Sequence, residues 1–156
     1  MAVMEPQSVL APAHASGIYR LEPQRVAALT NMGLVPPLPN FVEQLRTYEP
    51  SPIPPGMIER CIWFATGDDF MPTSLIGAEV RYDWGYMRWT LEVQELRGRS
   101  FFAIRRVLRH LAMVAREKGY LLTGELHADN TRMRRFVERV FGRTRADRVR
   151  YCWEFA

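Results

Sequence analysis

YMRWTLEVQELRGRS, residues 86–100, is the stretch that decides the fold. Its first half alternates apolar and polar side chains as a β-strand does, because successive residues of a strand point to opposite faces. The face that we expect in the core carries Met87, Trp89, Leu91 and Val93. The stretch ends in Arg97-Gly98-Arg99-Ser100, which predicts a short turn into the next element.

A helix is predicted directly after this turn, from about Ser100 to Lys118, with Gly119 as its C-cap. Apolar residues recur there at steps of three and four, so they share one helical face and are expected to be buried: Phe101, Ile104, Leu108, Leu111 and Ala115. A strand, a turn and a helix N-terminus make a natural anion site, since unpaired amides and the helix dipole point at it. The alternative is an ordinary connection that binds nothing.

The composition is that of a globular protein. The 156 residues are enough for one domain with a core, and 47% of them are hydrophobic and 24% charged. No apolar run approaches the ~18 residues of a membrane span, and the N-terminus lacks the pattern of a secretory signal. Cys61 and Cys152 lie in strand-like runs and are interpreted as small buried hydrophobes, not as a disulfide. No Cys/His spacing suggests a metal site.

Charge is unevenly placed along the chain. Residues 1–96 carry six Arg and eleven acidic residues, net −5, whereas residues 97–150 carry fourteen Arg, Lys118 and five acidic residues, net +10. Guanidinium groups pair well with carboxylates and phosphates, so we expect an acidic protein surface to bind six arginines of the basic half: Arg105, Arg106, Arg109, Arg132, Arg135 and Arg139. Plain solvation of these side chains is the alternative. Nucleic acid is less favoured, because no RNA- or DNA-binding motif accompanies the charge.

The order of elements predicts one mixed sheet. Residues 1–16 are expected to form an extended arm, and residues 17–156 a single domain. The predicted order is a strand (17–21), two helices (23–32 and 40–48), three strands (57–66, 74–82 and 86–93), the helix after Ser100, a strand (120–127), a helix (130–141) and a strand (148–155). The fold class is therefore α/β (α+β): a mixed, mostly antiparallel central sheet with helices on both faces.

This order resembles that of the GNAT N-acyltransferases. Residues 93–99, VQELRGR, are similar to the family's acyl-coenzyme A loop at the end of its fourth strand. Residues 126–139, LHADNTRMRRFVER, are similar to its later segment, in which a strand leads to an Asn and a helix. The resemblance covers about residues 17–155. It implies acetyl-coenzyme A as a cofactor, bound by Arg97, Gly98, Arg99, Ser100 and Asn130.

The loop departs from the family's pattern, which is Gln or Arg, two residues, Gly, one residue, and Gly or Ala. Aligned from Arg97, the two small positions are Ser100 and Phe102. Shifting the alignment so that Gly98 and Ser100 fill them puts Glu95 at the head, an acid facing a phosphate. Small residues let backbone amides approach the pyrophosphate, so we expect Phe102 or Glu95 to obstruct the coenzyme pocket.

The residues for acyl transfer are also incomplete. Many members of the family carry a Tyr on the later helix as the acid for the departing thiolate, and the matching Val137 cannot give a proton. The candidate bases are Glu92 and His127. Glu92 is either the base, acting directly or through water, or a solvent-facing strand acid paired with Arg88. His127 is either a catalyst or a hydrogen-bonding residue at the end of a strand.

A branch of the resemblance fits these losses. Small GNAT-like proteins occur in the virions of short-tailed bacteriophages, among them an internal virion protein with a degenerate coenzyme loop. This chain is similar to it in its basic long helix and in the Asn-Thr and Arg-Phe pairs of the later helix. The resemblance implies a non-enzymatic structural protein, a pseudoenzyme without cofactor that binds other virion proteins, in the virion or the host cytoplasm. The alternative is an acetyl-coenzyme A-dependent N-acyltransferase with an atypical loop.

Overall fold

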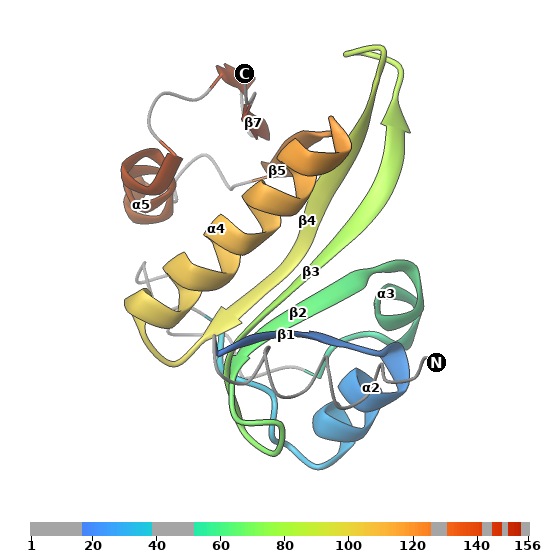
Figure 1. Ribbon diagram of the computed structural model, residues 1–156, viewed down its shortest axis with the longest axis vertical. Coiled ribbons are helices and arrows are strands. Elements are labelled where there is room, and N and C mark those ends of the chain that lie inside the picture. The colour runs from blue at the N-terminus through green and yellow to red at the C-terminus, as the bar shows by residue number, and fades with distance from the viewer. Residues whose placement is uncertain (1–16, 39–51, 126–130, 142–144, 148–149, 154–156) are drawn as a thin grey trace.

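The computed structural model describes residues 17–38, 52–125, 131–141, 145–147 and 150–153 (Figure 1). These ranges hold seven strands: β1 (Ile18–Leu21), β2 (Ile62–Gly67), β3 (Pro72–Asp83), β4 (Arg88–Gly98), β5 (Leu121–Glu125), β6 (Arg145–Asp147) and β7 (Arg150–Trp153). They also hold four helices: α2 (Pro23–Asn31), α3 (Pro55–Arg60), α4 (Phe101–Lys118) and α5 (Thr131–Phe141). The predicted arm at residues 1–16 and the predicted helix at residues 40–48 lie outside the described residues.

The strands form one sheet in the order β1-β2-β3-β4-β5-β7-β6. All neighbours pair antiparallel except β4 and β5, which are parallel and are connected by α4. A parallel pair needs such a crossover, because the chain must return to the end at which the first strand began. The mixed, mostly antiparallel sheet is therefore confirmed, and β2, β3 and β4 form an antiparallel meander in it.

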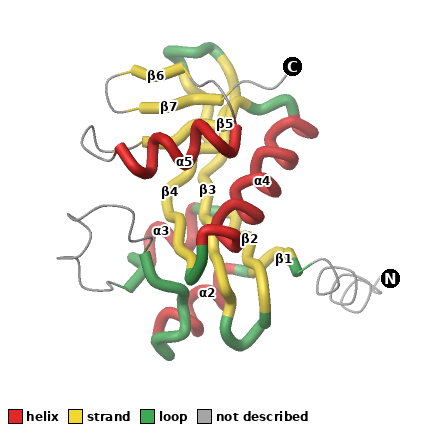
Figure 2. Tube along the Cα trace, turned by 90° about the vertical axis from the view of Figure 1, so that its left-hand side faces the viewer, coloured by secondary structure: helices red, strands yellow, loops and turns green. Residues whose placement is uncertain are grey.

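Two hydrophobic cores lie on opposite faces of the sheet, because successive residues of a strand point to opposite sides. Ile76 of β3 and Leu91 of β4 belong to the core that α4 and α5 cover. Leu75 of β3 and Trp63 of β2 belong to the core that α2 and α3 cover. Figure 2 shows α4 and α5 together on one side of the strands. The helices thus cover both faces, as the sequence predicts.

Helix α4 begins and ends where the sequence predicts. The Ser100 hydroxyl accepts a hydrogen bond from the Ala103 amide at 3.1 Å, and Gly119 ends the helix in the left-handed conformation with a φ of 71°. Four of the five predicted core residues are buried: Ile104, Leu108, Leu111 and Ala115. The prediction for Phe101 is wrong. Its side chain is 61% exposed because it faces α5 instead of the sheet, with its ring centroid 5.9 Å from that of Phe136.

The start of β4 also differs from the prediction. Met87 lies in the turn before the strand, is exposed, and has a φ of 55°, which is uncommon for a residue with a side chain. Trp89 lies in the strand, but it is half exposed and belongs to neither core. Trp89 lies level with the end of α4, where its ring contacts those of Tyr82 and Tyr120.

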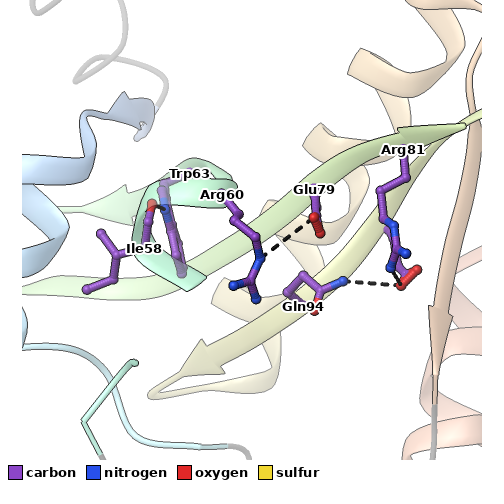
Figure 3. Close-up of polar contacts among 7 residues, drawn as sticks. Ile58, Arg60, Trp63, Glu79, Arg81 and Gln94 are labelled. Atoms are coloured by element: carbon purple, nitrogen blue, oxygen red, sulfur yellow. Dashed lines mark hydrogen bonds and ion pairs between the residues drawn. The ribbon is translucent and has the colours of Figure 1, made fainter. Parts of the chain in front are cut away.

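Two elements of the described chain were not predicted from the sequence, namely the helix α3 and the strand β6. Residues 57–60 belong to α3, not to a strand, because Pro55 occupies the first helical turn, where its missing amide is tolerated. The Trp63 indole donates a hydrogen bond to the Ile58 carbonyl at 3.0 Å across the junction of α3 and β2 (Figure 3). Near the end of the chain, β7 confirms the strand predicted at residues 148–155 over its described residues, and β6, which the sequence did not predict, pairs with it antiparallel.

The described helices and Cys61 agree with what the sequence predicts about membrane spans and disulfides. None of the helices in the described residues is long and apolar enough to cross a membrane. Cys61 is buried and free, as expected, and burial raises the pKa of its thiol to about 12. The side chain of Cys152 lies outside the described part of the chain.

We predict that Gly98→Ala destabilises the protein by about 1–3 kcal/mol, because an added Cβ collides with the side chain of Ile104. Gly56→Ala in α3 is the matched control. Its Cβ meets only the flexible end of Arg60 at 3.2 Å, so this variant should be neutral or more stable. Thermal or urea unfolding measures both variants. Equal stability of the two would contradict the role of Gly98 in packing.

Candidate functional site

Two successive amides of the predicted coenzyme loop are bonded inside the protein. The Gly98 N–H donates to the carbonyl of Pro37 at 2.9 Å, and the Arg99 N–H donates to the carbonyl of Thr73 at 2.8 Å. These amides are therefore engaged at the position where the resemblance expects them to face a phosphate. Gly98 lacks a side chain because Ile104 packs where its Cβ would lie.

The first turn of α4 keeps some donors open. Ser100 acts as the N-cap, and its hydroxyl occupies the amide of Ala103. The amides of Ser100 and Phe102 have no hydrogen-bond partner among the residues that the structure describes. These N–H groups and the positive end of the helix dipole remain available to an anion.

Arg97 lies away from this turn. Its side chain is only 2% exposed, and its Nε is 2.7 Å from Oε2 of Glu95. In the pairing of β3 and β4, Arg97 is opposite Leu75 and Glu95 is opposite Gly77, which places both charged residues on the face that α2 and α3 cover. The Glu95 carboxylate therefore contacts a guanidinium on this face.

Strands β4 and β5 separate at a β-bulge. The register between β3 and β4 shifts by one residue, so that Gln94 has no opposite residue. The parallel pairing of β4 with β5 ends at the same level, at Val93 and Gly124. Within the described ranges, β4 pairs only with β3 from Gln94 to Gly98, and no strand pairs with its other edge, where the Gly98 N–H is bonded to Pro37.

Glu92 lies just before this fork, on the face opposite α4. Only 8% of its surface is exposed, and its carboxylate accepts hydrogen bonds from Arg81 at 3.4 Å and from the side-chain amide of Gln94 at 3.2 Å. Figure 3 shows Arg81 and Gln94 near Glu79, which pairs with Arg60 at 3.7 Å. The expectation of a solvent-facing Glu92 is wrong, because side chains on the same face enclose the carboxylate.

A second buried polar group lies beside Glu92. Thr123 of β5 is opposite Glu92 in the parallel register, so the two side chains share one face of the sheet. The Thr123 hydroxyl is fully buried, and it has no hydrogen-bond partner within the described structure. Such an atom is an exception, since buried polar groups nearly always have a partner. A single Thr in an apolar strand carries no sequence signal for this environment.

A cleft of about 860 Å³ lies between the first turn of α4 and helix α5. Figure 1 shows the two helices as neighbours on the same side of the sheet. The cleft is lined by basic and apolar side chains: Phe101, Phe102, Arg105, Arg132, Arg135, Phe136, Arg139 and Val140. The Phe102 ring forms part of the wall and is 69% exposed.

The arginines of this cleft have no carboxylate partner among the described residues. Arg132, Arg135 and Arg139 follow one another at helical spacing along α5, and Arg105 extends from α4 into the same cleft. In the described part of the chain, none of the four forms an ion pair with a carboxylate. The cleft therefore combines concentrated positive charge with an aromatic wall.

The six arginines predicted to bind a partner thus divide into two groups. Four line the cleft between α4 and α5, and they are exposed as predicted. Arg109 is exposed but does not line the cleft. Arg106 is half-buried, and its guanidinium lies over the Phe102 ring, 5.8 Å from the centroid. Their contact with an acidic protein surface stays a prediction.

The other site candidates fall into the core or outside the described residues. Val137 is buried among apolar side chains of α4 and the sheet, so it is a packing residue. His127 and Asn130 lie outside the described residues. No group of His, Cys, Asp and Glu that could hold a metal ion occurs among the described residues.

Two buried groups with shifted pKa values lie away from the cleft. Burial raises the pKa of Tyr19, whose hydroxyl donates to the carbonyl of Asp68 at 2.7 Å. Burial also lowers the pKa of His110 on α4, whose ring packs edge-on against Phe64. Both groups are held by packing, and neither lines the α4–α5 cleft.

Several solved structures to which this chain is similar are described as acetyltransferases. A probable acetyltransferase matches with a TM-score of 0.58 at 10% identity, over 83% of this chain and 90% of its own. An N-acetyltransferase from Staphylococcus aureus Mu50 matches with a TM-score of 0.55 at 11% identity, over 88% and 96%. An aminoglycoside acetyltransferase from an uncultured soil metagenomic sample, in complex with sisomicin, matches with a TM-score of 0.59 at 10% identity, over 83% and 90%.

These similarities establish the fold class. The chain has a GNAT-like fold, with a mixed sheet and the α4 crossover between its two parallel strands. No protein-family model and no curated protein sequence matches the chain.

We predict that Thr123→Val leaves the protein as stable as the parent or more stable, because it removes a buried hydroxyl that has no partner in the described structure. Thr90→Val is the matched control on β4. The Thr90 hydroxyl is also buried, but it donates to the carbonyl of Arg81 at 3.0 Å, so its loss should cost about 1 kcal/mol. Urea unfolding compares the two. A Thr123 variant destabilised as much as the Thr90 variant would show that the hydroxyl is bonded after all.

Proposed function

We propose that this chain is an N-acyltransferase that uses acetyl-coenzyme A and transfers its acyl group to an amine. The observation that carries the proposal is the basic and aromatic cleft at the start of α4, on a fold shared with acetyltransferases. Coenzyme A carries phosphates and a purine ring, and both have complementary side chains in this cleft. When bound, the coenzyme supplies an acyl group activated as a thioester.

The residues present fit this coenzyme, although the loop departs from the family's pattern. The amides of Gly98 and Arg99 donate to protein carbonyls and cannot bind a phosphate, but those of Ser100 and Phe102 have no partner among the described residues and can. The Phe102 ring lines the cleft and leaves a volume of about 860 Å³. Ligand sites commonly have volumes of about 300–1,000 Å³, so the cleft is large enough for the nucleotide end of the coenzyme.

Beyond the fork, the edge of β4 offers a second set of contacts. From Gln94 to Gly98 the strand has backbone groups that β5 does not pair within the described structure. An extended ligand with amide groups can bond such an edge as an added strand would. The pantetheine arm of coenzyme A is a ligand of this kind, and the edge leads from the start of α4 toward Glu92.

Glu92 is the proposed base. A primary amine is protonated near neutral pH, with a pKa of about 10, and must lose a proton before its nitrogen can attack. The Glu92 carboxylate can take that proton, and its bonds to Arg81 and Gln94 fix its orientation. Val137 offers no acid, but a thiol with a pKa of about 8.5 leaves as thiolate with little assistance.

The second candidate function is that of a non-catalytic GNAT-fold scaffold, including the role as a virion component. The observations that favour it are the burial of Val137 in the core and the internal hydrogen bonds of the Gly98 and Arg99 amides. In that case the exposed arginines bind an acidic protein surface, and the cleft holds no coenzyme.

Thermal unfolding with acetyl-coenzyme A distinguishes the two candidates. A ligand present at ~100 times its dissociation constant stabilises a protein by ~2.7 kcal/mol. We therefore expect a raised melting temperature with acetyl-coenzyme A and a smaller rise with an equal concentration of sodium phosphate. An unchanged melting temperature at saturating acetyl-coenzyme A would contradict the acyltransferase and favour the scaffold.

We further predict that Glu92→Gln lowers the rate of acetyl transfer to an amine by about 10²–10⁴-fold, because the amide cannot take a proton. Acetyl-coenzyme A binding should be unchanged, since Glu92 lies on the face opposite α4. Glu79→Gln is the control, as Glu79 is directly opposite Glu92 on β3 and has its own partner in Arg60. Similar rates for the two variants would exclude Glu92 as the base.

A further inference from the structure

The nucleotide end of the coenzyme is the part best matched by this chain's own side chains, an inference that rests on the proposed function. We propose that the 3′-phosphate of coenzyme A, held by the arginines of the α4–α5 cleft, carries most of the affinity, and that the pyrophosphate loop contributes little. The chain should therefore distinguish coenzyme A from its 3′-dephospho form.

The loop has lost donors that a pyrophosphate requires. Two successive amides, those of Gly98 and Arg99, are committed to the carbonyls of Pro37 and Thr73. Arg97, the side chain at the head of the loop motif, is buried against Glu95 on the other face of the sheet. What remains is the pair of amides at Ser100 and Phe102 and the helix dipole. This is a smaller set than an open helix N-terminus provides.

The cleft supplies the charge that the loop lacks. Four guanidinium groups line one space, and no carboxylate pairs with any of them among the described residues. A phosphate monoester carries a charge of about −1.5 to −2 near neutral pH and offers three acceptor oxygens. Each phosphoryl of a pyrophosphate diester carries only one negative charge. Planar guanidinium groups bind phosphate oxygens in pairs, so the monoester at the 3′ position is the better match.

The aromatic side chains fit the adjoining purine. Phe101 and Phe136 have ring centroids 5.9 Å apart, and Phe102 exposes most of its ring to the same cleft. Exposed apolar rings gathered in one place mark a binding surface more often than a plain protein surface. Stacking on such rings holds a base without requiring particular hydrogen bonds. Adenosine carrying a 3′-phosphate therefore matches both the rings and the arginines.

Calorimetric titration with defined ligands tests this inference on the intact chain. Acetyl-coenzyme A and adenosine 3′,5′-bisphosphate should bind with affinities within about tenfold of each other. Loss of the 3′-phosphate should weaken binding by at least about tenfold, the effect of one charge-assisted hydrogen bond. Acetyl-pantetheine, which has no nucleotide, should show no measurable binding. Raising the salt concentration should weaken the binding of acetyl-coenzyme A more than the binding of its 3′-dephospho form.

A cycle of variant and ligand shows whether the arginines act on this phosphate. Arg135→Gln should weaken the binding of acetyl-coenzyme A by about tenfold or more and that of the 3′-dephospho form by much less. The reason is that only acetyl-coenzyme A carries the 3′-phosphate with which Arg135 would pair. Arg132→Gln should behave in the same way and serves as the second variant. Arg109→Gln is the control, since Arg109 is exposed on α4 outside the cleft. Melting temperatures confirm that each variant is folded.

The outcomes separate this inference from the proposed function. Equal binding of acetyl-coenzyme A and its dephospho form, or equal weakening of both by Arg135→Gln, would overturn the inference and leave the acyltransferase standing. Tighter binding of an unrelated single-stranded oligonucleotide than of adenosine 3′,5′-bisphosphate would overturn it in favour of nucleic acid. A parent protein that binds no acetyl-coenzyme A would remove the proposed function and, with it, this binding mode.

Discussion

The close packing of Ile104 on Gly98 is the constraint on which the rest of the structure depends. Because Gly98 has no side chain, the first turns of α4 can lie directly on the end of β4 after a turn of only two residues. From there α4 runs across the sheet over Leu91 and Leu122 and returns the chain to a parallel β5. The same contact sets the first turn of α4 beside α5, so the cleft between the two helices is a consequence of core packing.

The parts of the fold that depend on local chemistry could be predicted from the sequence. Ser100 and Gly119 mark the ends of α4 because capping is decided by a few neighbouring residues. Phe101 fits the helical periodicity of α4 and Trp89 fits the strand alternation of β4, yet both are exposed. Periodicity shows which face of a helix or strand is apolar, but not how far along that face the neighbouring element covers it. Each of these two residues lies at an end of its element, beyond the part that the core covers.

The site was less predictable than the fold, because its residues meet only through tertiary packing. Helical spacing alone places Arg132, Arg135 and Arg139 together, but the position of Arg105 across from them depends on how α4 lies against α5. The motif placed Arg97 at a phosphate, whereas the register of β3 and β4 turns it to the opposite face. A strand register reverses with a shift of one residue, and the bulge at Gln94 is such a shift.

Phosphate recognition through side chains has different physical properties from recognition through a backbone loop. Backbone amides are fixed by the helix and cost nothing when the ligand is absent. Four guanidinium groups in one cleft, none of them paired with a carboxylate in the described part of the chain, repel one another, and an anion that enters relieves this repulsion. In the proposed binding mode, ligand affinity and protein stability are therefore coupled more strongly than in a loop of amides, and both are sensitive to salt. The packing at Gly98 explains why side chains would replace the loop in this binding mode. Ile104 occupies the space at Gly98 that could admit a phosphate, so an anion at this end of α4 would be held by the arginines beside the turn.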